Sequence, residues 1–286
     1  MPQAAAQALE LAPFTLAPLT PTIGAEIGGI DIGQPLDTAT IAALRAALLE
    51  WKVIFFREQD ITVEQHLAFG RQFGVLEINP FNPQLPDHPE VIPLNHGPNG
   101  KGAENAWHSD VTWSSTPSMG SILRAVVVPD AGGDTLFADM YAAYETLDDE
   151  TKQLIEGRKA MHYSNHMASV LRRLGATEEK VAETVRNFPP VEHPIVRTHP
   201  ETGRKALYVN TAFTTHIVGM EAAESKALLR RLYAQASIPE HQCRFKWRPN
   251  SLAFWDNRCS QHYAASDYFP AVRRMQRVTI VGDRPY

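Results

Sequence analysis

The sequence has few cysteines, no long apolar run and no basic segment at its start. Its 286 residues include only Cys243 and Cys259, too few to cross-link a chain of this length and without the paired spacing of a zinc site. No window approaches the roughly 18 apolar residues of a membrane span. Residues 1–13 contain no Lys or Arg, so they lack the positive segment of a signal peptide. We therefore expect a cytoplasmic protein with no membrane partner and a flexible terminus at residues 1–13.

The chain also lacks the basic excess that nucleic-acid binding requires. It has 27 Lys and Arg against 32 Asp and Glu, which gives a formal net charge of -5. Because a phosphate backbone is recognised by a positive face, we expect no nucleic-acid partner. An anionic ligand would instead be bound by a few arginines inside a pocket. The 44% hydrophobic and 21% charged residues are typical of a globular protein.

Hydrophobic periodicity predicts a single domain, residues 1–286, with many short strands. Apolar residues at three- and four-residue spacing predict helices over residues 38–51, 62–73, 149–156, 177–186 and 220–236. Apolar or alternating runs predict strands near residues 52–56, 122–128, 135–138, 243–247, 251–255 and 277–281, and a hairpin over 195–209 that turns at 201–203. Six prolines predict a long loop over residues 79–101. Short strands joined by turns favour a β-sandwich or barrel with added helices.

One of the eleven histidines stands in a pattern that suits a metal ion. In the segment from Trp107 to Asp110, an extended backbone would point the side chains of His108 and Asp110 to the same side. Two histidines and one carboxylate form the facial triad of non-haem iron oxygenases, which leaves positions open for a co-substrate and O₂. Zinc is an alternative at this point, because hydrolases use the same ligand types.

Two further His-X-Glu segments compete with this pattern. His88 and His199 are each followed by a proline and then a glutamate. Proline favours turn or polyproline geometry, and His199 falls where the predicted hairpin bends. We therefore interpret His88 and His199 as structural residues.

The C-terminal segment adds a third candidate ligand. It begins with Trp-Asp-Asn-Arg at residues 255–258 and continues through His262 to Arg273 and Arg277. It closely resembles the C-terminal motif of the taurine dioxygenase group of Fe(II)/2-oxoglutarate-dependent enzymes. In that group the same four residues precede the distal histidine ligand, and an arginine follows that histidine by eleven residues, as Arg273 does here.

Other segments match the same group in the same order. They are Trp-His-Ser-Asp at residues 107–110, Gly-Gly-Asp-Thr at 132–135, Phe-Thr-Thr at 213–215 and the stretch 20–32. The likeness runs from about Leu16 to Pro285. It implies a mainly β fold with flanking helices, the double-stranded β-helix (jelly roll) of clavaminate synthase-like proteins.

The resemblance also implies a set of site residues. His108, Asp110 and His262 would be both the catalytic residues and the ligands of Fe(II). Arg273 and Thr135 would hold the distal carboxylate of 2-oxoglutarate, since a guanidinium fork suits a carboxylate better than a lysine does. With O₂, 2-oxoglutarate would be converted to succinate and CO₂ while a substrate is hydroxylated.

The substrate-facing positions differ from those of a taurine enzyme. By resemblance, Arg277 would meet a substrate anion or else support 2-oxoglutarate, and Val111 and Phe213 would form an apolar wall. The positions that hold the taurine amine in the group carry Asn79, Asn82 and Glu104 here. A taurine amine would therefore lack its usual partners.

The resemblance thus predicts a dioxygenase for a small organic anion, acting as a homo-oligomer such as a dimer or tetramer. An organosulfonate or alkyl sulfate ester, cleaved with release of sulfite or sulfate, is the first expectation for the substrate. A phenoxyalkanoate (aryloxy acid) is the alternative within the same superfamily. A non-catalytic or zinc-bound jelly roll that merely binds an anion is the alternative from a different class.

Overall fold

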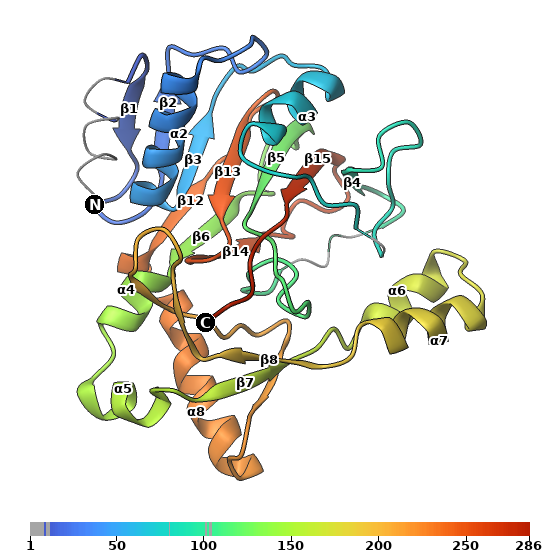
Figure 1. Cartoon of the computed structure of the whole chain (residues 1–286). Helices are drawn as coiled ribbons and strands as arrows, with labels where there is room; N and C mark the ends of the chain where they lie inside the picture. The colour runs from blue at the N-terminus through green and yellow to red at the C-terminus, as the bar shows by residue number, and fades with distance from the viewer. Residues whose placement is uncertain (1–8, 10–11, 80, 101, 103–104) are drawn as a thin grey trace.

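The computed structural model describes residues 9, 12–79, 81–100, 102 and 105–286. Its main element is a seven-stranded sheet in the order β1-β2-β3-β13-β5-β15-β4, shown in Figure 1. Neighbouring strands are antiparallel except for the parallel pair of β2 and β3. The strands are β1 (Thr15–Pro18), β2 (Ala25–Gly28), β3 (Val53–Phe56), β13 (Leu252–Asp256), β5 (Gly120–Val127), β15 (Arg273–Ile280) and β4 (Val91–His96).

A three-stranded antiparallel sheet packs against the large sheet. Its order is β12-β6-β14, with β12 (Gln242–Phe245), β6 (Thr135–Asp139) and β14 (Ser260–Ala264). Aromatic side chains fill the space between the sheets: the Phe55 ring stacks on Phe245 at 4.0 Å between centroids and meets Phe137 edge-on at 5.6 Å. Two sheets, antiparallel apart from the pair of β2 and β3, that close over a shared core form a jelly roll. The predicted fold class is confirmed.

Two helices cover the outer face of the large sheet, α2 (Thr38–Trp51) and α3 (Val63–Arg71), as Figure 1 shows. The Asp37 side chain caps α2 by accepting a hydrogen bond from the Thr40 amide. Leu44 and Leu48 bury the apolar face of α2 in the core. Because a helix covers one face of β13 and the small sheet the other, every residue of this strand is buried, which explains its apolar run.

A second layer of helices and short strands is appended to the jelly roll. Its strands are β7 (Lys159–His162), β8 (Val191–Pro194), β11 (Thr214–Ile217) and the hairpin of β9 (Val196–Thr198) with β10 (Lys205–Leu207). Its helices are α4 (Met140–Glu145), α5 (Asp149–Ile155), α6 (Met167–Arg173), α7 (Glu178–Asn187) and α8 (Ala222–Ala234), with 3-10 turns η1 (Gln235–Ser237) and η2 (Pro239–His241). The α6–α7 pair projects from the body of the molecule (Figure 1).

The sequence predicted the hairpin and helices α2, α3, α5, α7 and α8 to within two residues at nearly every end. It did not predict α4, α6, β1, β2, β7, β8, β11 or β14. The long loop predicted over 79–101 is partly wrong, because Val91–His96 forms β4 and pairs with β15. Since β4 is an edge strand, Pro93 does not interrupt the sheet there. In the part of the chain that the structure describes, no helix is long and apolar enough to cross a membrane.

Candidate active site

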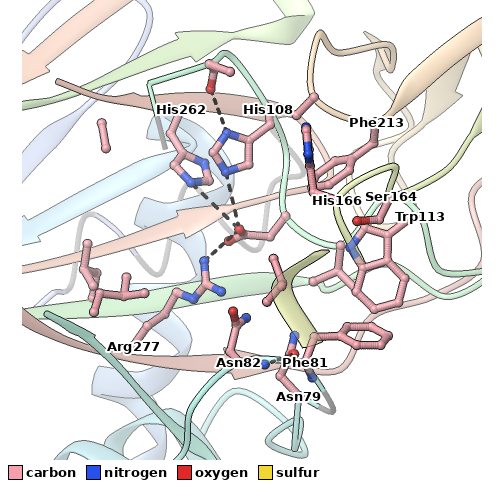
Figure 2. Close-up of a pocket in the computed structure, with 18 of the residues that line it drawn as sticks. Asn79, Phe81, Asn82, His108, Trp113, Ser164, His166, Phe213, His262 and Arg277 are labelled. Carbon is pink, nitrogen blue, oxygen red and sulfur yellow. Dashed lines mark hydrogen bonds and ion pairs between the residues drawn. The ribbon is translucent and has the colours of Figure 1, made fainter. Parts of the chain in front are cut away.

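Two histidines that are 154 positions apart meet at one end of the jelly roll. The His108 amide donates to the His262 carbonyl at 3.1 Å, and the His262 amide donates to the His108 carbonyl at 2.8 Å. This isolated bridge extends the edge of β14 and places the two imidazoles side by side, with ring centroids 4.2 Å apart. Figure 2 shows both rings facing the same carboxylate.

That carboxylate belongs to Asp110. Its Oδ1 lies 3.8 Å from His108 Nε2 and 3.9 Å from His262 Nε2. Because metal–ligand bonds of about 2.1 Å allow two ligands of one ion to lie up to about 4.2 Å apart, these separations suit a single ion. The Ser121 hydroxyl donates to Oδ2 at 2.9 Å, and Arg277 Nη1 donates to Oδ1 at 2.9 Å.

The protonation states of this group suit metal binding. Burial and, to a smaller extent, the neighbouring His108 lower the pKa of His262 to about 3. The imidazole of His262 is therefore neutral near pH 7. Burial alone would raise the pKa of Asp110, but Arg277 and the two imidazoles hold that pKa well below its usual range. His108 Nδ1 lies 2.8 Å from the Ala106 carbonyl, which can only accept, so Nδ1 carries a proton and Nε2 is the ring nitrogen that faces Asp110. A carboxylate and two neutral imidazoles are the donors that iron(II) takes in a facial triad.

Strand β15 carries both predicted arginines on one face. Arg273 and Arg277 share the inward face with the fully buried Met275, whereas Arg274 is exposed. Arg273 is 4% exposed, and its Cζ lies 5.9 Å from the ring centroids of Trp247 and of Tyr268. The even spacing of the motif therefore gives two inward guanidinium groups along one strand.

The Gly-Gly-Asp-Thr segment closes around Arg273. Gly132 and Gly133 both have positive φ, 79° and 73°, and a Cβ on Gly133 would lie 3.3 Å from Arg273 Cδ. The next buried polar group, the Thr135 hydroxyl, accepts a hydrogen bond from Trp247 Nε1 at 2.9 Å. Its own proton can thus be donated toward the pocket, which suits a ligand carboxylate beside Arg273.

A pocket of about 440 Å³ joins these groups. It is lined by every predicted site residue that the structure describes: Asn79, Asn82, His108, Asp110, Val111, Thr135, Phe213, His262, Arg273 and Arg277. Glu104 lies outside the described residues. The sequence missed Phe81, Trp113, His166, Met167 and Val170, which also line the pocket. No sequence signal indicated His166, Met167 and Val170, because helix α6 was not predicted.

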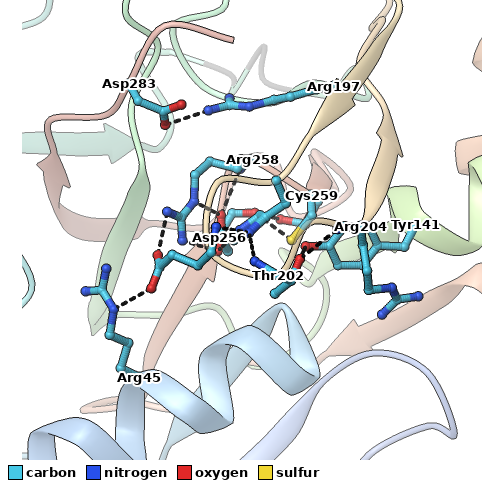
Figure 3. Close-up of polar contacts among 12 residues, drawn as sticks. Arg45, Tyr141, Arg197, Thr202, Arg204, Asp256, Arg258, Cys259 and Asp283 are labelled. Carbon is cyan, nitrogen blue, oxygen red and sulfur yellow. Dashed lines mark hydrogen bonds and ion pairs between the residues drawn. The ribbon is translucent and has the colours of Figure 1, made fainter. Parts of the chain in front are cut away.

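The structure contains a second group of three potential ligands, His199, Asp256 and Cys259, all buried (Figure 3). Here Asp256 accepts two hydrogen bonds from Arg258 on Oδ1, while Oδ2 accepts from Arg258 Nη2 at 2.6 Å and from His199 Nε2 at 3.1 Å. His199 Nδ1 accepts from the amides of residues 201 and 202. With these lone pairs in use, this group is an internal ion-pair network.

A jelly roll with a neutral-histidine and carboxylate triad, opening on an arginine-lined pocket, has the architecture of the 2-oxoglutarate-dependent non-haem iron dioxygenases. The model of the taurine catabolism dioxygenase TauD, TfdA family matches residues 15–279. The chain belongs to this family.

Relatives and solved structures agree with this membership. The chain is 35% identical to an alpha-ketoglutarate-dependent sulfate ester dioxygenase of Pseudomonas putida, over 97% of this chain and 94% of that protein. It is also 35% identical to an (S)-phenoxypropionate/alpha-ketoglutarate-dioxygenase of Sphingobium herbicidovorans, over 94% and 96% of the two chains. A taurine dioxygenase structure from Burkholderia xenovorans superposes with a TM-score of 0.82 at 38% identity, covering 96% of this chain and 92% of that chain.

A further solved structure, of AAD-2 in complex with Mn(II) and N-oxalylglycine, superposes with a TM-score of 0.79 at 33% identity, over 95% of this chain and 98% of that chain. The protein is thus a 2-oxoglutarate-dependent dioxygenase that uses Fe(II), 2-oxoglutarate and O₂. The alternative of a non-catalytic or zinc-bound jelly roll is not supported.

Proposed function

We propose that His108, Asp110 and His262 hold Fe(II) and that Arg273 and Thr135 hold the distal carboxylate of 2-oxoglutarate. When bound, the iron, 2-oxoglutarate and O₂ supply oxidative decarboxylation to succinate and CO₂ coupled to hydroxylation of a substrate C–H bond. The protein contributes the ionised Asp110 and the neutral imidazoles as ligands. It also contributes a fixed guanidinium for the co-substrate and walls that orient the C–H bond.

The proposed substrate is a small organic anion bound by Arg277. Its side chain is 12% exposed, lines the pocket, and uses Nη1 to bind Asp110. Its Nε is buried and has no hydrogen-bond partner among the described residues. A guanidinium has five N–H donors, so this group can bind Asp110 and an incoming sulfonate, sulfate or carboxylate together.

The observation that carries this assignment is the spacing of the two inward arginines. Four residues of extended strand separate the Cα atoms of Arg273 and Arg277 by about 13 Å. One side of the pocket therefore offers two separate cationic positions. We assign the deeply buried Arg273 to 2-oxoglutarate and Arg277, next to the triad, to the substrate.

The other lining residues of the pocket suit a substrate without an amine. Asn79 Oδ1 accepts from the amides of Phe81 and Asn82 at 2.9 and 3.2 Å, so this oxygen is used to hold its own loop. Phe81, Val111 and Phe213 contribute apolar surface. An alkyl sulfate ester or amine-free sulfonate, cleaved with release of sulfate or sulfite, fits these walls better than taurine does.

A phenoxyalkanoate is the second candidate, and one feature favours it. The rings of Phe81, Trp113 and Phe188 form a cluster of edge-to-face contacts with centroids 4.8, 4.9 and 5.3 Å apart. Phe81 and Trp113 from this cluster line the pocket. Such a wall accepts an aryl ring as readily as an alkyl chain.

Succinate formation from 2-oxoglutarate, measured with alkyl sulfates, amine-free sulfonates, phenoxyalkanoates and taurine, tests the proposal. We expect an alkyl sulfate or sulfonate to have the highest kcat/KM and taurine to have a lower one. In Arg277→Ala the kcat/KM for the best anion should fall by about 10–100-fold, as expected for a lost charge-assisted contact. The exposed neighbour Arg274→Ala is the matched control. Taurine as the best substrate, or equal effects at both arginines, would overturn the assignment.

We further propose one domain over residues 1–286, a homo-oligomer, and a cytoplasmic location. The family model matches residues 15–279 as one unit, which supports a single domain. Both cysteines are free and buried, which suits a reducing compartment.

A further inference from the structure

Val111, the residue after the proposed metal ligand Asp110, has an unusual backbone conformation. Its φ is 60°, in the left-handed region. Glycine and asparagine tolerate this region, but a β-branched side chain there is strained. Among the described non-glycine residues with positive φ, which also include Lys52, Glu58 and Asn250, only Val111 is β-branched. Neighbouring contacts must therefore hold it.

The next residue, Thr112, supplies such contacts. Thr112 is fully buried, its Oγ1 accepts from Asn210 Nδ2 at 3.0 Å, and the same oxygen lies 3.1 Å from His162 Nδ1. Its carbonyl lies 3.0 Å from His193 Nε2. Burial lowers the pKa of both histidines, which favours their neutral forms.

The other end of the Asn210 amide faces the substrate wall. Its Oδ1 accepts from the amides of Ala212 and Phe213 at 3.2 and 2.9 Å. The Phe213 ring lines the pocket, and its centroid lies 6.1 Å from that of His108. One buried amide therefore contacts the segment that carries Asp110 and the segment that carries the wall.

We propose that Asn210 and Thr112 are positioning residues that hold Val111 in its left-handed conformation and thereby fix Asp110 relative to the wall of Val111 and Phe213. The Thr112 hydroxyl anchors the strained turn from one side, and Asn210 links that anchor to Phe213. This inference rests on the proposed role of Asp110 as a metal ligand.

Removal of the hydroxyl tests the anchor. In the full-length apoprotein, the isosteric Thr112→Val should weaken Co(II) binding by about 10–100-fold, a loss typical of changes to the partners of metal ligands. Thr112→Ser keeps the hydroxyl and should restore Co(II) affinity close to that of the wild type. Unchanged Co(II) affinity in a folded Thr112→Val protein would overturn the proposal, as would a Thr112→Ser protein as weak as Thr112→Val.

The strain has its own test, which does not depend on metal. Val111→Gly and Val111→Ala both remove the apolar side chain, but only glycine adopts positive φ without penalty. The urea midpoint of the Val111→Gly apoprotein should therefore exceed that of Val111→Ala, and the same order should hold when each is combined with Thr112→Val. A midpoint for Val111→Gly at or below that of Val111→Ala would overturn the proposal, even if Thr112→Val fails to fold.

Asp110→Asn separates this inference from the site assignment. If Asp110→Asn keeps wild-type Co(II) affinity, the proposed metal site is wrong. If Asp110→Asn loses Co(II) binding while Thr112→Val keeps it, the site stands and only the positioning role of Thr112 and Asn210 is wrong.

Discussion

Two buried clusters of this protein each bring a carboxylate, a histidine and a third potential ligand within 4.8 Å, yet they differ in what those groups can do. In the first cluster, Asp110 accepts one hydrogen bond on each oxygen, and His108 and His262 point their Nε2 atoms at it. In the second, Asp256 accepts two hydrogen bonds on each oxygen.

Since a carboxylate has about four lone-pair positions, Asp110 keeps about two for a metal and Asp256 keeps none. The clusters also differ in access. Asp110 lines the pocket, whereas Asp256 is fully buried, pairs with Arg258 (Figure 3) and is hydrogen-bonded to His199. Close approach of ligand-type side chains therefore does not define a metal site by itself; unused lone pairs that open on a cavity do.

The largest expected effect of this difference is on turnover. His108→Ala, Asp110→Ala or His262→Ala should each abolish Fe(II)-dependent succinate formation, because each removes one of the three proposed ligands. Iron content and turnover of the purified variants measure this loss, with circular dichroism as a check on folding. The control is His88→Ala, since His88 contacts only the exposed Glu64 among the described ion pairs. Near-normal turnover in any of the three variants would refute the triad.

Substitution in the second cluster should lower the stability of the fold rather than turnover. Asp256→Asn removes the buried carboxylate partner of Arg258, which is 4% exposed and keeps an ion pair only with the partly exposed Glu201 among the described residues. Breaking a buried ion pair in this way costs about 3–5 kcal/mol of unfolding free energy. Urea unfolding measures it, and Glu26→Gln, which breaks the more exposed pair with Arg57, should cost about 1 kcal/mol or less. Equal losses in the two variants would contradict the distinction drawn here.

A smaller effect is expected at the co-substrate position. Arg273→Lys keeps a positive charge but loses the planar fork, so the apparent affinity for 2-oxoglutarate should fall by about tenfold or more. Equilibrium titration of 2-oxoglutarate into the Co(II)-loaded protein measures it. Arg274→Lys, on the outward face of the same strand, is the matched control. If Arg273→Lys binds 2-oxoglutarate with the same affinity as the wild type, Arg273 does not hold the co-substrate.

The sequence predicted the first cluster much better than the second. The proposed ligands and the two arginines stand in short sequence motifs, and strand alternation alone places Arg273 and Arg277 on one face. Helices such as α2 were predicted because a capping residue and a full apolar stripe lie within the helix itself.

The remaining features depend on contacts between distant segments. The partners of Thr112 lie 50 and 98 positions away, and His199 lies 57 positions from Asp256, so no local pattern announces them. Strand β4 was missed because the effect of Pro93 depends on its place at the sheet edge, which only the fold reveals. Left-handed Val111 gave no signal, because its residue type argues against that conformation.

The smallest effect concerns the rim of the second cluster, where Glu201 bridges Arg258 and Arg45 at 2.7 Å each. Burial would raise the pKa of Glu201, but Arg45 and Arg258 outweigh it and lower that pKa. A carboxyl whose pKa is lower in the folded state stabilises the protein above its unfolded pKa, near 4.3, and loses this contribution as the pH falls through the folded value.

Glu201→Gln should therefore reduce the unfolding free energy by about 1 kcal/mol or less at pH 7, because Glu201 and Arg45 are partly exposed to solvent. The difference from the wild type should stay constant down to about pH 5 and shrink progressively as the pH falls below about 4.3, through the lowered pKa of Glu201 in the folded state. Urea unfolding across this range measures it, while Co(II) affinity should not change. Asp256 lies at the buried end of this network and Glu201 at its exposed end. The loss of unfolding free energy should therefore be larger in Asp256→Asn than in Glu201→Gln. A loss at Glu201 as large as that at Asp256, or a change in Co(II) affinity, would mean that the two clusters are coupled.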